Sequence, residues 1–289
     1  MFRFLWDRLH QYWLLARFHR PIGIFLLLWP MLWALWIAGK GHPNSEVLFV
    51  FLVGSILMRS AGCAINDYAD RDLDPFVNRT KDRPLATGHV GPSEAIGMFV
   101  VFSLIAFFLV LRMNTLTILL SFFGGFLALS YPFTKRYTHL PQFYLGMAFG
   151  WAVPMVFAAQ TGKIPVVAWT IFLVAIVWAV VYDTLYAMVD REDDVKIGVR
   201  STAILFGAWD RTIIAVLQII VIALLEWVGR KVQLGNIYFL GLFLSSGFFF
   251  YQQYLIRKRE PTRCFQAFLN NHWFGMVLFV SIFLDFLCK

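Results

Sequence analysis

Nine apolar stretches recur along the 289-residue chain, and short polar segments separate them. Each is about 17–20 residues long, which is enough for a helix to cross the hydrocarbon core of a bilayer. They lie at residues 22–38, 46–64, 95–111, 115–132, 142–159, 165–182, 212–229, 236–254 and 272–287. Only 15% of the residues are charged, against about 25% in soluble domains. The sequence therefore predicts an all-α polytopic membrane protein with about nine transmembrane helices.

The first twenty residues are too charged to span a membrane. Four arginines are interleaved there with Phe, Leu and Trp, namely Arg3, Arg8, Arg17 and Arg20. This pattern is typical of an amphipathic helix that lies on the membrane surface. We therefore expect residues 1–20 to form an interfacial helix.

Lysine and arginine are distributed unevenly between the two sides of the predicted bundle. With the N-terminus in the cytoplasm, 18 of them lie on that side and six on the far side, while Arg59 falls inside a span. Short cytoplasmic loops carry such an excess. The sequence thus predicts a multi-pass protein of a bacterial inner (plasma) membrane with a cytoplasmic N-terminus. The net charge of +8 then reflects topology, and no nucleic-acid partner is expected.

Two connections on the cytoplasmic side are long, at residues 65–94 and 183–211, and together they hold 12 of the 17 acidic residues. Neither segment is long enough to bury a core of its own. We expect a single membrane domain over residues 1–289, with these two segments as cytoplasmic active-site loops. The three cysteines include no C-x-x-C pair, which argues against a disulfide framework or a zinc site. The six histidines show no ligand spacing either.

Each long connection begins with a cluster of acids. Asn66, Asp70 and Asp74 are spaced four residues apart, and so are Asp190 and Asp194, so each set lies on one face if the helix continues. Two carboxylates about 6 Å apart repel each other by roughly 3 kcal/mol at an effective dielectric near 20. Divalent cations relieve this repulsion, and oxygen ligands of this kind suit Mg²⁺ that shares its shell with phosphate.

Basic residues follow both clusters. Arg79, Lys81 and Arg83 come after the first, and Lys196 and Arg200 come after the second. Acids for a metal with bases beside them for phosphate are typical of a diphosphate site. Solvated loop acids without a chemical role are the alternative, and the matching positions of the two clusters argue against it.

The two clusters also form an internal repeat. The segment Ala69-Asp70-Arg71-Asp72-Leu73-Asp74 aligns with Val189-Asp190-Arg191-Glu192-Asp193-Asp194, 120 residues later. Four predicted spans separate them, so the two halves run in parallel and both clusters reach the same membrane face. We expect two parallel pseudo-repeats around a central cavity, with one site shared between them.

These motifs resemble the UbiA superfamily of membrane prenyltransferases. The family pattern Asn-Asp-x-x-Asp-x-x-x-Asp stands here as Asn66, Asp67, Asp70 and Asp74, and its second pattern Asp-x-x-x-Asp as Asp190 and Asp194. The flanks resemble the 4-hydroxybenzoate branch of ubiquinone synthesis, in the segments at residues 17–23, 131–142, 182–191 and 194–198. The likeness covers nearly the whole chain and is weakest at the far C-terminus.

The resemblance implies transfer of a polyprenyl group from polyprenyl diphosphate to the ring of 4-hydroxybenzoate, ortho to the hydroxyl, with Mg²⁺ as cofactor. It assigns the metal to Asn66, Asp70, Asp74, Asp190 and Asp194, with Asp67 and Asp183 nearby. Basic candidates for the substrate anions, in falling order, are Arg136, Lys135, Arg79, Lys196 and Arg20, with Arg17 or Arg20 nearer the acceptor. Asp70, Asp74, Asp190, Asp194 and Arg136 are then the residues expected to be catalytic.

Alternative functions remain compatible with the sequence. A cation-coupled transporter also carries intramembrane acids, although transporters place them near the midplane and often in inverted repeats. Another acceptor, such as a naphthoate, homogentisate or haem, is compatible with the motifs alone. The Asp-Gly-x-x-Ala-Arg signature of CDP-alcohol phosphotransferases is absent. Arg59, seven residues before Asn66, either points towards the site or pairs structurally within the membrane.

Overall fold

A computed structural model describes residues 2–289, with side chains from residue 6 onward. Met1 and the side chain of Arg3 lie outside this part. The described chain is helical and contains no strand. Its α-helices are α1 (Phe2–Leu15), α2 (Ile22–Ala38), α3 (Ser45–Asp70), α4 (Pro92–Val110), α5 (Thr115–Ser130), α6 (Pro141–Gly150), α7 (Ala152–Thr161), α8 (Val166–Ile197), α9 (Thr202–Phe206), α10 (Asp210–Lys231), α11 (Asn236–Leu255) and α12 (Pro261–Leu287).

The predicted spans are confirmed. Among the described residues, eight helical segments are long and apolar enough to cross a membrane, and α2 is a shorter apolar helix of 17 residues. The segment that the sequence predicts as one span at 142–159 is divided into α6 and α7. Pro154 explains the break, because it lacks the N–H that would bond to the carbonyl of Gly150.

Three helices extend further than their apolar stretches. α3 continues to Asp70 and α8 to Ile197, so α8 carries the whole second motif on added helical turns. α3 carries only Asn66 and Asp70 of the first metal set, because Asp74 lies in a separate 3₁₀ turn, Asp74–Phe76. α8 ends at Gly198, whose φ of +72° lies in the left-handed region that suits glycine. α12 begins at Pro261 and not at residue 272. Hydropathy does not detect its first turns, because they contain polar residues such as Arg263, Asn270 and Asn271.

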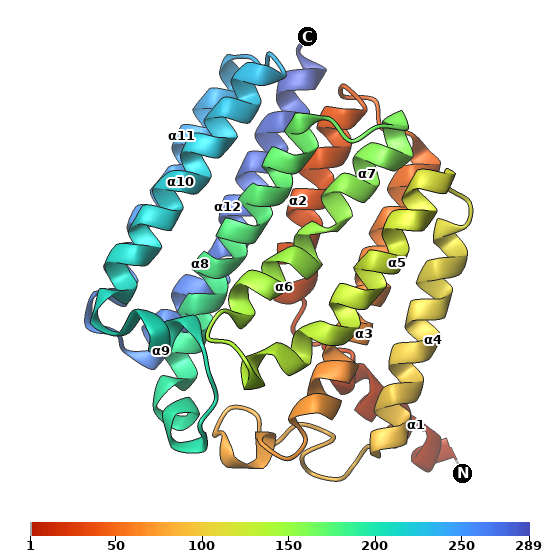
Figure 1. The fold of residues 1–289 in the computed structure, drawn as a ribbon, viewed down its shortest axis with the longest axis vertical. Helices are drawn as coiled ribbons and strands as arrows, with labels where there is room; N and C mark the ends of the chain where they lie inside the picture. Colours follow the sequence, from red (N-terminus) through yellow and green to blue (C-terminus); the bar gives the residue numbers. More distant parts are fainter. Residues whose placement is uncertain (1) are drawn as a thin grey trace.

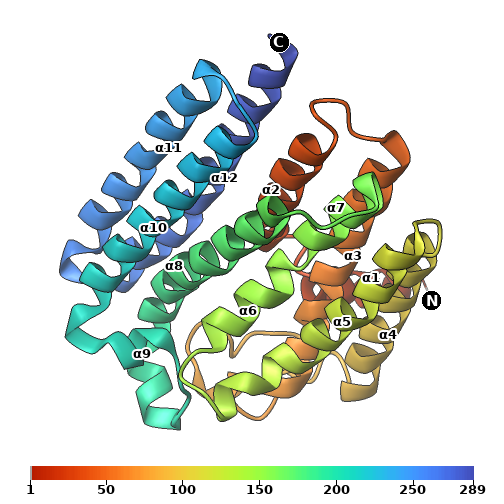
Figure 2. The ribbon, with the colours of Figure 1, turned by 45° about the horizontal axis from the view of Figure 1, so that its top comes forward.

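The long helices run side by side in a bundle, and the termini lie at opposite ends (Figure 1). α10, α11 and α12 group on one flank and α4 and α5 on the other (Figures 1 and 2). α6 packs closely on α8 because Gly146 has no side chain, since a Cβ there would come within 2.8 Å of Ile176 Cα. α3 and α8 both end at the end that holds α1 and α9 (Figure 1), as the parallel pseudo-repeat predicts.

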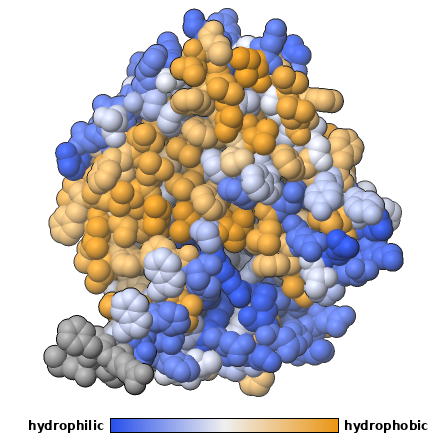
Figure 3. Space-filling view, turned by 180° about the vertical axis from the view of Figure 1, so that it is seen from behind, coloured by the Kyte–Doolittle hydropathy of each residue, from blue (hydrophilic) through white to orange (hydrophobic). Residues whose placement is uncertain are grey.

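The outer surface of the bundle is apolar. Phe108, Phe243 and Phe250 are among the large side chains exposed there, and apolar residues cover the middle of the molecule in Figure 3. Polar residues gather at the end that holds α1 and the loop at residues 71–91 (Figure 3). An apolar belt of this kind matches a protein that crosses a membrane several times.

α1 has the two faces that the sequence predicts. Trp6, Leu9 and Trp13 are exposed, Trp6 by 74%, whereas Leu15 is fully buried. Arg8 donates to the carbonyl of His89 at 2.7 Å, which ties the helix to the segment before α4. The apolar outer face suits a helix that rests on the membrane surface, and that position remains a prediction.

Candidate active site

Two cavities meet at the polar end of the bundle. The larger has a volume of about 790 Å³ and the smaller about 150 Å³. Residues from both halves of the chain line both cavities, namely Asn66, Arg79, Arg83, Tyr131, Asp183 and Tyr186. The two cavities therefore adjoin at these side chains, and we refer to the pair as the compartment, with an apolar and a polar part.

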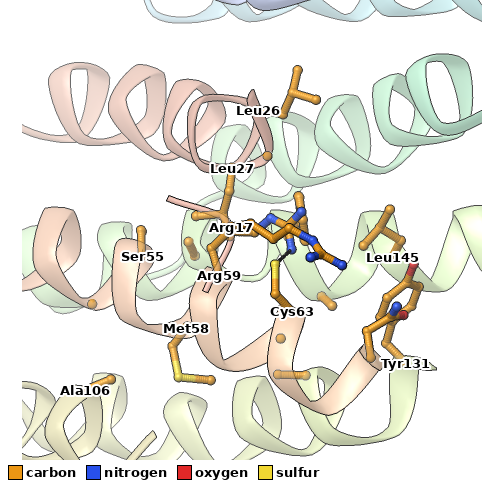
Figure 4. A pocket seen from close by; sticks show the side chains of 18 of the residues that line it. Arg17, Leu26, Leu27, Ser55, Met58, Arg59, Cys63, Ala106, Tyr131 and Leu145 are labelled. Carbon is orange, nitrogen blue, oxygen red and sulfur yellow. Dashed lines mark hydrogen bonds between the residues drawn. The ribbon is translucent and has the colours of Figure 1, made fainter. Parts of the chain in front are cut away.

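The larger cavity extends into the bundle between apolar side chains. Leu26, Leu27, Met58 and Leu145 form part of its wall (Figure 4). Further lining residues lie on α3, α4, α5 and α7 or between them, among them Phe51, Phe107, Phe122, Trp151 and Met155. This part of the compartment accommodates a long hydrocarbon chain and offers it few polar partners.

The smaller cavity collects the acids of both motifs. Its wall contains all five residues that the sequence assigns to the metal, together with Asp183: Asn66, Asp70, Asp74, Asp190 and Asp194. The first three come from the end of α3 and the turn after it, and the last two from the end of α8. The structure thus brings together side chains that lie 120 residues apart, because the two helices end at the same face.

Asp67 and Asp74 share one arginine. Arg83 Nη1 lies 3.1 Å from Asp67 Oδ1 and 2.9 Å from Asp74 Oδ2. Asp67 is 1% exposed and also accepts from Arg17 Nη2 at 2.8 Å. The loop at residues 71–91 is thereby fastened to α3 and to the segment after α1.

The pKa values of these groups reflect this pairing. Burial raises the pKa of Asp74, although Arg83 acts in the opposite direction. Burial alone would lower the pKa of Arg83, but Asp67 and Asp74 outweigh it, so its pKa lies above the usual value. Arg17 remains below its usual pKa, because burial outweighs its contact with Asp67. Arg83 is therefore held as a cation between two carboxylates.

Asp70 is 3% exposed and has one free oxygen. Its Oδ2 accepts from Asn66 Nδ2 at 3.1 Å and forms an ion pair with Lys135, whereas its Oδ1 is buried without a hydrogen-bond partner. A buried carboxylate oxygen without a partner is costly. Lys135 belongs to the 3₁₀ turn Tyr131–Arg136 after α5, which carries this cation into the cavity.

The second motif is tied to the first loop. Arg79 Nη2 lies 2.6 Å from Asp190 Oδ2, and the Arg79 guanidinium stacks over the Tyr186 ring at 4.3 Å. Asn78 donates to Asp193 from its backbone and its side chain, each at 3.3 Å. Asp194 makes no ion pair within the described part of the chain. Loop 71–91 therefore crosses from one half of the protein to the other.

The remaining predicted basic residues lie in different places. Arg17 and Arg20 line the larger cavity. Arg136, the first choice from the sequence, lines neither cavity and donates to the carbonyl of Ala69. Lys196 also lines neither cavity and is largely exposed beside Asp193. The order of candidates therefore changes, since Lys135 and Arg79 lie in the cavity wall and Arg136 supports the end of α3.

Three arginines outside the substrate-binding set predicted from the sequence also line the compartment, namely Arg59, Arg83 and Arg200. The sequence marks Arg83 only as one of the bases after the first cluster. Arg59 projects from α3 into the larger cavity (Figure 4). Its Nη1 lies 2.7 Å from Cys63 Sγ and its guanidinium is 5.5 Å from the Phe149 ring centre. Its position two helical turns before Asn66 is the signal that points to it.

The donor set fits a hard divalent cation. Within the described side chains, no group of three or more His, Cys, Asp or Glu is close enough to hold a metal alone. Mg²⁺ needs only one or two carboxylates when phosphate oxygens and waters complete its shell. The free Oδ1 of Asp70 and the Asp194 carboxylate, both in the wall of the smaller cavity, meet that requirement.

Comparison with known proteins identifies the family. The pattern of the UbiA prenyltransferase family matches residues 27–280. A 4-hydroxybenzoate octaprenyltransferase of Methylococcus capsulatus is 62% identical over 281 residues, which cover 97% of this chain and 96% of the relative. The corresponding enzyme of Nitrosococcus oceani is 60% identical over 281 residues, covering 97% and 99% of the two chains.

Solved structures share the fold. The apo structure of a UbiA homologue from Aeropyrum pernix K1 superimposes with a TM-score of 0.80 at 24% identity, covering 91% of this chain and 97% of that one. A UbiA homologue from Archaeoglobus fulgidus, bound to GPP and Mg²⁺, gives a TM-score of 0.71 at 17% identity, with coverages of 94% and 99%. Motifs, bundle and relatives agree, and the chain belongs to the UbiA prenyltransferase family.

Proposed function

We propose that this protein transfers a polyprenyl group from polyprenyl diphosphate to the ring carbon of 4-hydroxybenzoate ortho to its hydroxyl, in ubiquinone biosynthesis. The observation that carries the proposal is an apolar cavity that shares lining residues with a smaller cavity into whose wall both acidic motifs bring their side chains. Relatives named 4-hydroxybenzoate octaprenyltransferase, at 52–62% identity over nearly the whole chain, support the same acceptor. No comparable observation supports the alternative hypothesis of a cation-coupled transporter.

The diphosphate lies in the polar part of the compartment in this proposal. Asn66, Asp70 and Asp74 from one half of the chain and Asp190 and Asp194 from the other would hold Mg²⁺, which would supply positive charge to neutralise the departing diphosphate. Asp67 and Asp183 stay close to these residues, and Asp67 keeps Arg17 and Arg83 in place.

Basic side chains add to the stabilisation of the leaving group. Arg79, Arg83 and Lys135 lie in the wall of the smaller cavity. Preorganised cations stabilise developing negative charge without reorganising during the reaction. As the bond between the prenyl C1 and the diphosphate oxygen breaks, these cations face the oxygen that gains charge.

Aromatic rings border the position of the allylic carbon. Tyr131 and Tyr186 line both cavities, and Tyr182 lines the larger one. Ring faces attract a cation and exclude water from it. The three tyrosines therefore protect the electron-poor prenyl carbon until the acceptor ring attacks it, after which the ring carbon passes its proton to the released diphosphate.

The acceptor brings its own carboxylate, which requires a cation away from the diphosphate. Arg59 lines the larger cavity, makes no ion pair in the described chain, and has a buried Nε without a hydrogen-bond partner. Arg17, which the family resemblance favours together with Arg20, is already paired with Asp67. We therefore assign the acceptor carboxylate to Arg59, with Arg20 at the cavity rim.

Replacement of Arg59 tests this assignment. Arg59→Ala is expected to raise KM for 4-hydroxybenzoate by about 10- to 100-fold, since a charge-assisted pair contributes about 1.5–3 kcal/mol. KM for the prenyl diphosphate should change much less. Arg136→Ala is the matched control, because Arg136 lies outside both cavities. Steady-state kinetics with both substrates varied measure the difference, and equal changes in both KM values would remove Arg59 from the acceptor site.

Complementation tests the function in cells. The chain is expressed in a bacterial strain that lacks its own 4-hydroxybenzoate prenyltransferase, and ubiquinone is measured in lipid extracts. The wild type should restore ubiquinone, and an Asp190→Asn variant present at the same level in the membrane should not. Insertion of the wild type without ubiquinone would contradict the proposed acceptor.

We place the active-site loops at residues 65–94 and 183–211 in the cytoplasm of a bacterial cell, with the bundle in the inner membrane. Single cysteines at 75–94 and 195–210 should then react with an impermeant thiol reagent only from the cytoplasmic side. Cysteines beside Gly41 or Gly162 should react only from the other side. Labelling of the two acidic loops from opposite sides would refute a shared site.

A further inference from the structure

Asp210, the first residue of α10, is a fully buried carboxylate outside both cavities. Two arginines from distant parts of the chain meet at it. Arg191 comes from the last turns of α8, and Arg259 from the connection between α11 and α12. None of these three residues has a part in the function proposed above.

Both oxygens of Asp210 are fully engaged. Arg191 Nη2 donates to Oδ2 at 2.5 Å, while Arg259 donates from Nε at 3.0 Å and from Nη2 at 2.8 Å. The backbone N–H of Arg211 adds a bond of 2.6 Å to Oδ1. Charge-assisted bonds in this number hold the connected segments in one geometry.

Arg259 is itself fixed in place. Its Nη2 also donates to the carbonyl of Ala208 at 2.8 Å, and its φ of +56° lies in the left-handed region. A non-glycine residue keeps that backbone conformation only when its surroundings hold it. Asp210 and Arg259 thus form a rigid support, and Arg191 is the group from α8 that rests on it.

Arg191 follows Asp190 directly in the chain, and the two side chains have different partners. Asp190 binds Arg79 of loop 71–91, while Arg191 binds Asp210. Consecutive residues of a helix point about 100° apart. The last turns of α8 are therefore held from two directions, and this fixes the rotation at which Asp190 and Asp194 face the smaller cavity.

We propose that Asp210 is a positioning residue for the second acidic motif, acting through Arg191. This inference rests on the proposed function. Without the Asp210 charge, two guanidinium groups would face each other without a counter-ion. Arg191 would lose its only carboxylate partner in the described chain, and its Nε is already buried without a hydrogen bond. The end of α8 is then free to rotate, and the carboxylates of Asp190 and Asp194 lose their alignment.

A purely structural role predicts a different result. If Asp210 only stabilises the fold, its replacement lowers Tm and the amount of active enzyme, but leaves the Mg²⁺ requirement and both KM values unchanged. A positioning role changes the binding constants of one substrate and not the other. Supporting partners of metal ligands typically alter metal affinity by about 10- to 100-fold.

The experiment compares Asp210→Asn with the wild type and with Asp285→Asn. Asp285 is also a buried aspartate that accepts from backbone N–H groups, of Gly235 at 2.7 Å and Tyr238 at 3.3 Å, but it lies near the C-terminus at the opposite end. Purified full-length proteins are heated with and without Mg²⁺ plus farnesyl S-thiolodiphosphate, an unreactive donor analogue. Activity is measured over a range of Mg²⁺ and of each substrate.

For Asp210→Asn we expect the rise in Tm on adding Mg²⁺ and analogue to be largely lost. The Mg²⁺ concentration for half-maximal activity and KM for the prenyl diphosphate should rise by about tenfold, and KM for 4-hydroxybenzoate should stay within about twofold. Asp285→Asn should have a lower starting Tm but keep the full rise. Arg259→Gln, at a partly exposed position, should show the same pattern more weakly and serves if Asp210→Asn does not fold.

Two results would overturn the proposal, and they differ. In the first, Mg²⁺ and the analogue raise the Tm of Asp210→Asn and of Arg259→Gln as much as that of the wild type. This result refutes the positioning role and leaves the proposed function intact. In the second, Mg²⁺ and the analogue do not raise the Tm of the wild type. This result refutes the proposed function itself, and with it the inference about Asp210.

Discussion

Replacing one motif aspartate with asparagine should lower turnover by about 100- to 1000-fold, the range found when a preorganised transition-state contact is removed. Asp70→Asn and Asp190→Asn are the informative variants, because the two residues line one cavity from different halves of the chain. Asparagine keeps the size of the side chain but removes the anionic oxygen that Mg²⁺ prefers. Turnover of purified protein at saturating Mg²⁺ and substrates gives the measurement.

The chain supplies matched controls for these variants. Asp72 lies between Asp70 and Asp74 in the first motif, yet its side chain is 72% exposed. Glu192 is likewise exposed between Asp190 and Asp194. Asp72→Asn and Glu192→Gln should keep turnover within about twofold, since exposed surface charges contribute little. Equal losses of turnover in the controls and the motif variants would show that turnover depends on the negative charge near the membrane and not on the carboxylates that line the cavity.

Arg83→Ala should produce the second large effect, a loss of about 100-fold or more in kcat. Arg83 contacts Asp67 and Asp74 and lines both cavities. Its removal leaves two buried carboxylates without their common cation, and breaking such a pair typically costs about 3–5 kcal/mol. A lower Tm should therefore accompany the loss of activity.

Two further variants separate the loss of kcat from the loss of Tm. Arg83→Lys keeps the charge and should recover part of kcat and most of Tm. Lys81→Ala, at an exposed position on the same loop, should be close to the wild type. An Arg83→Ala enzyme that turns over at the wild-type rate would exclude Arg83 from the diphosphate site and leave it as a loop anchor.

The architecture follows closely from the sequence because its physical cause is local. A bilayer accepts only helices or closed barrels, so stretches of apolar residues directly predict the spans and their number. The positions of Asp70 and Asp190 follow from the same reasoning, since both sit at the ends of helices that run in the same direction. The boundaries of α12 could not be predicted, because Asn270, Asn271 and His272 are polar residues within a membrane helix.

The basic residues of the site follow less well from the sequence, for a physical reason. Proximity in sequence to a motif does not say which way a side chain points. Lys135 and Arg136 are neighbours, yet Lys135 pairs with Asp70 in the cavity while Arg136 binds the Ala69 carbonyl. Arg83 enters the site through the path of loop 71–91, which has no helical period to predict it. Arg59 is the exception, since its position two helical turns before Asn66 predicts the face of α3 on which it lies.

The most direct test of the central claim is the identity of the product. Purified protein is incubated with a polyprenyl diphosphate, Mg²⁺ and ring-labelled aromatic acids, including 4-hydroxybenzoate and a naphthoate, and the lipid-soluble products are identified by mass spectrometry. We predict one main product, 4-hydroxybenzoate prenylated ortho to its hydroxyl, which disappears with EDTA and returns with Mg²⁺. Prenylation of another acid in preference to 4-hydroxybenzoate, or product formation that EDTA does not affect, would contradict this account.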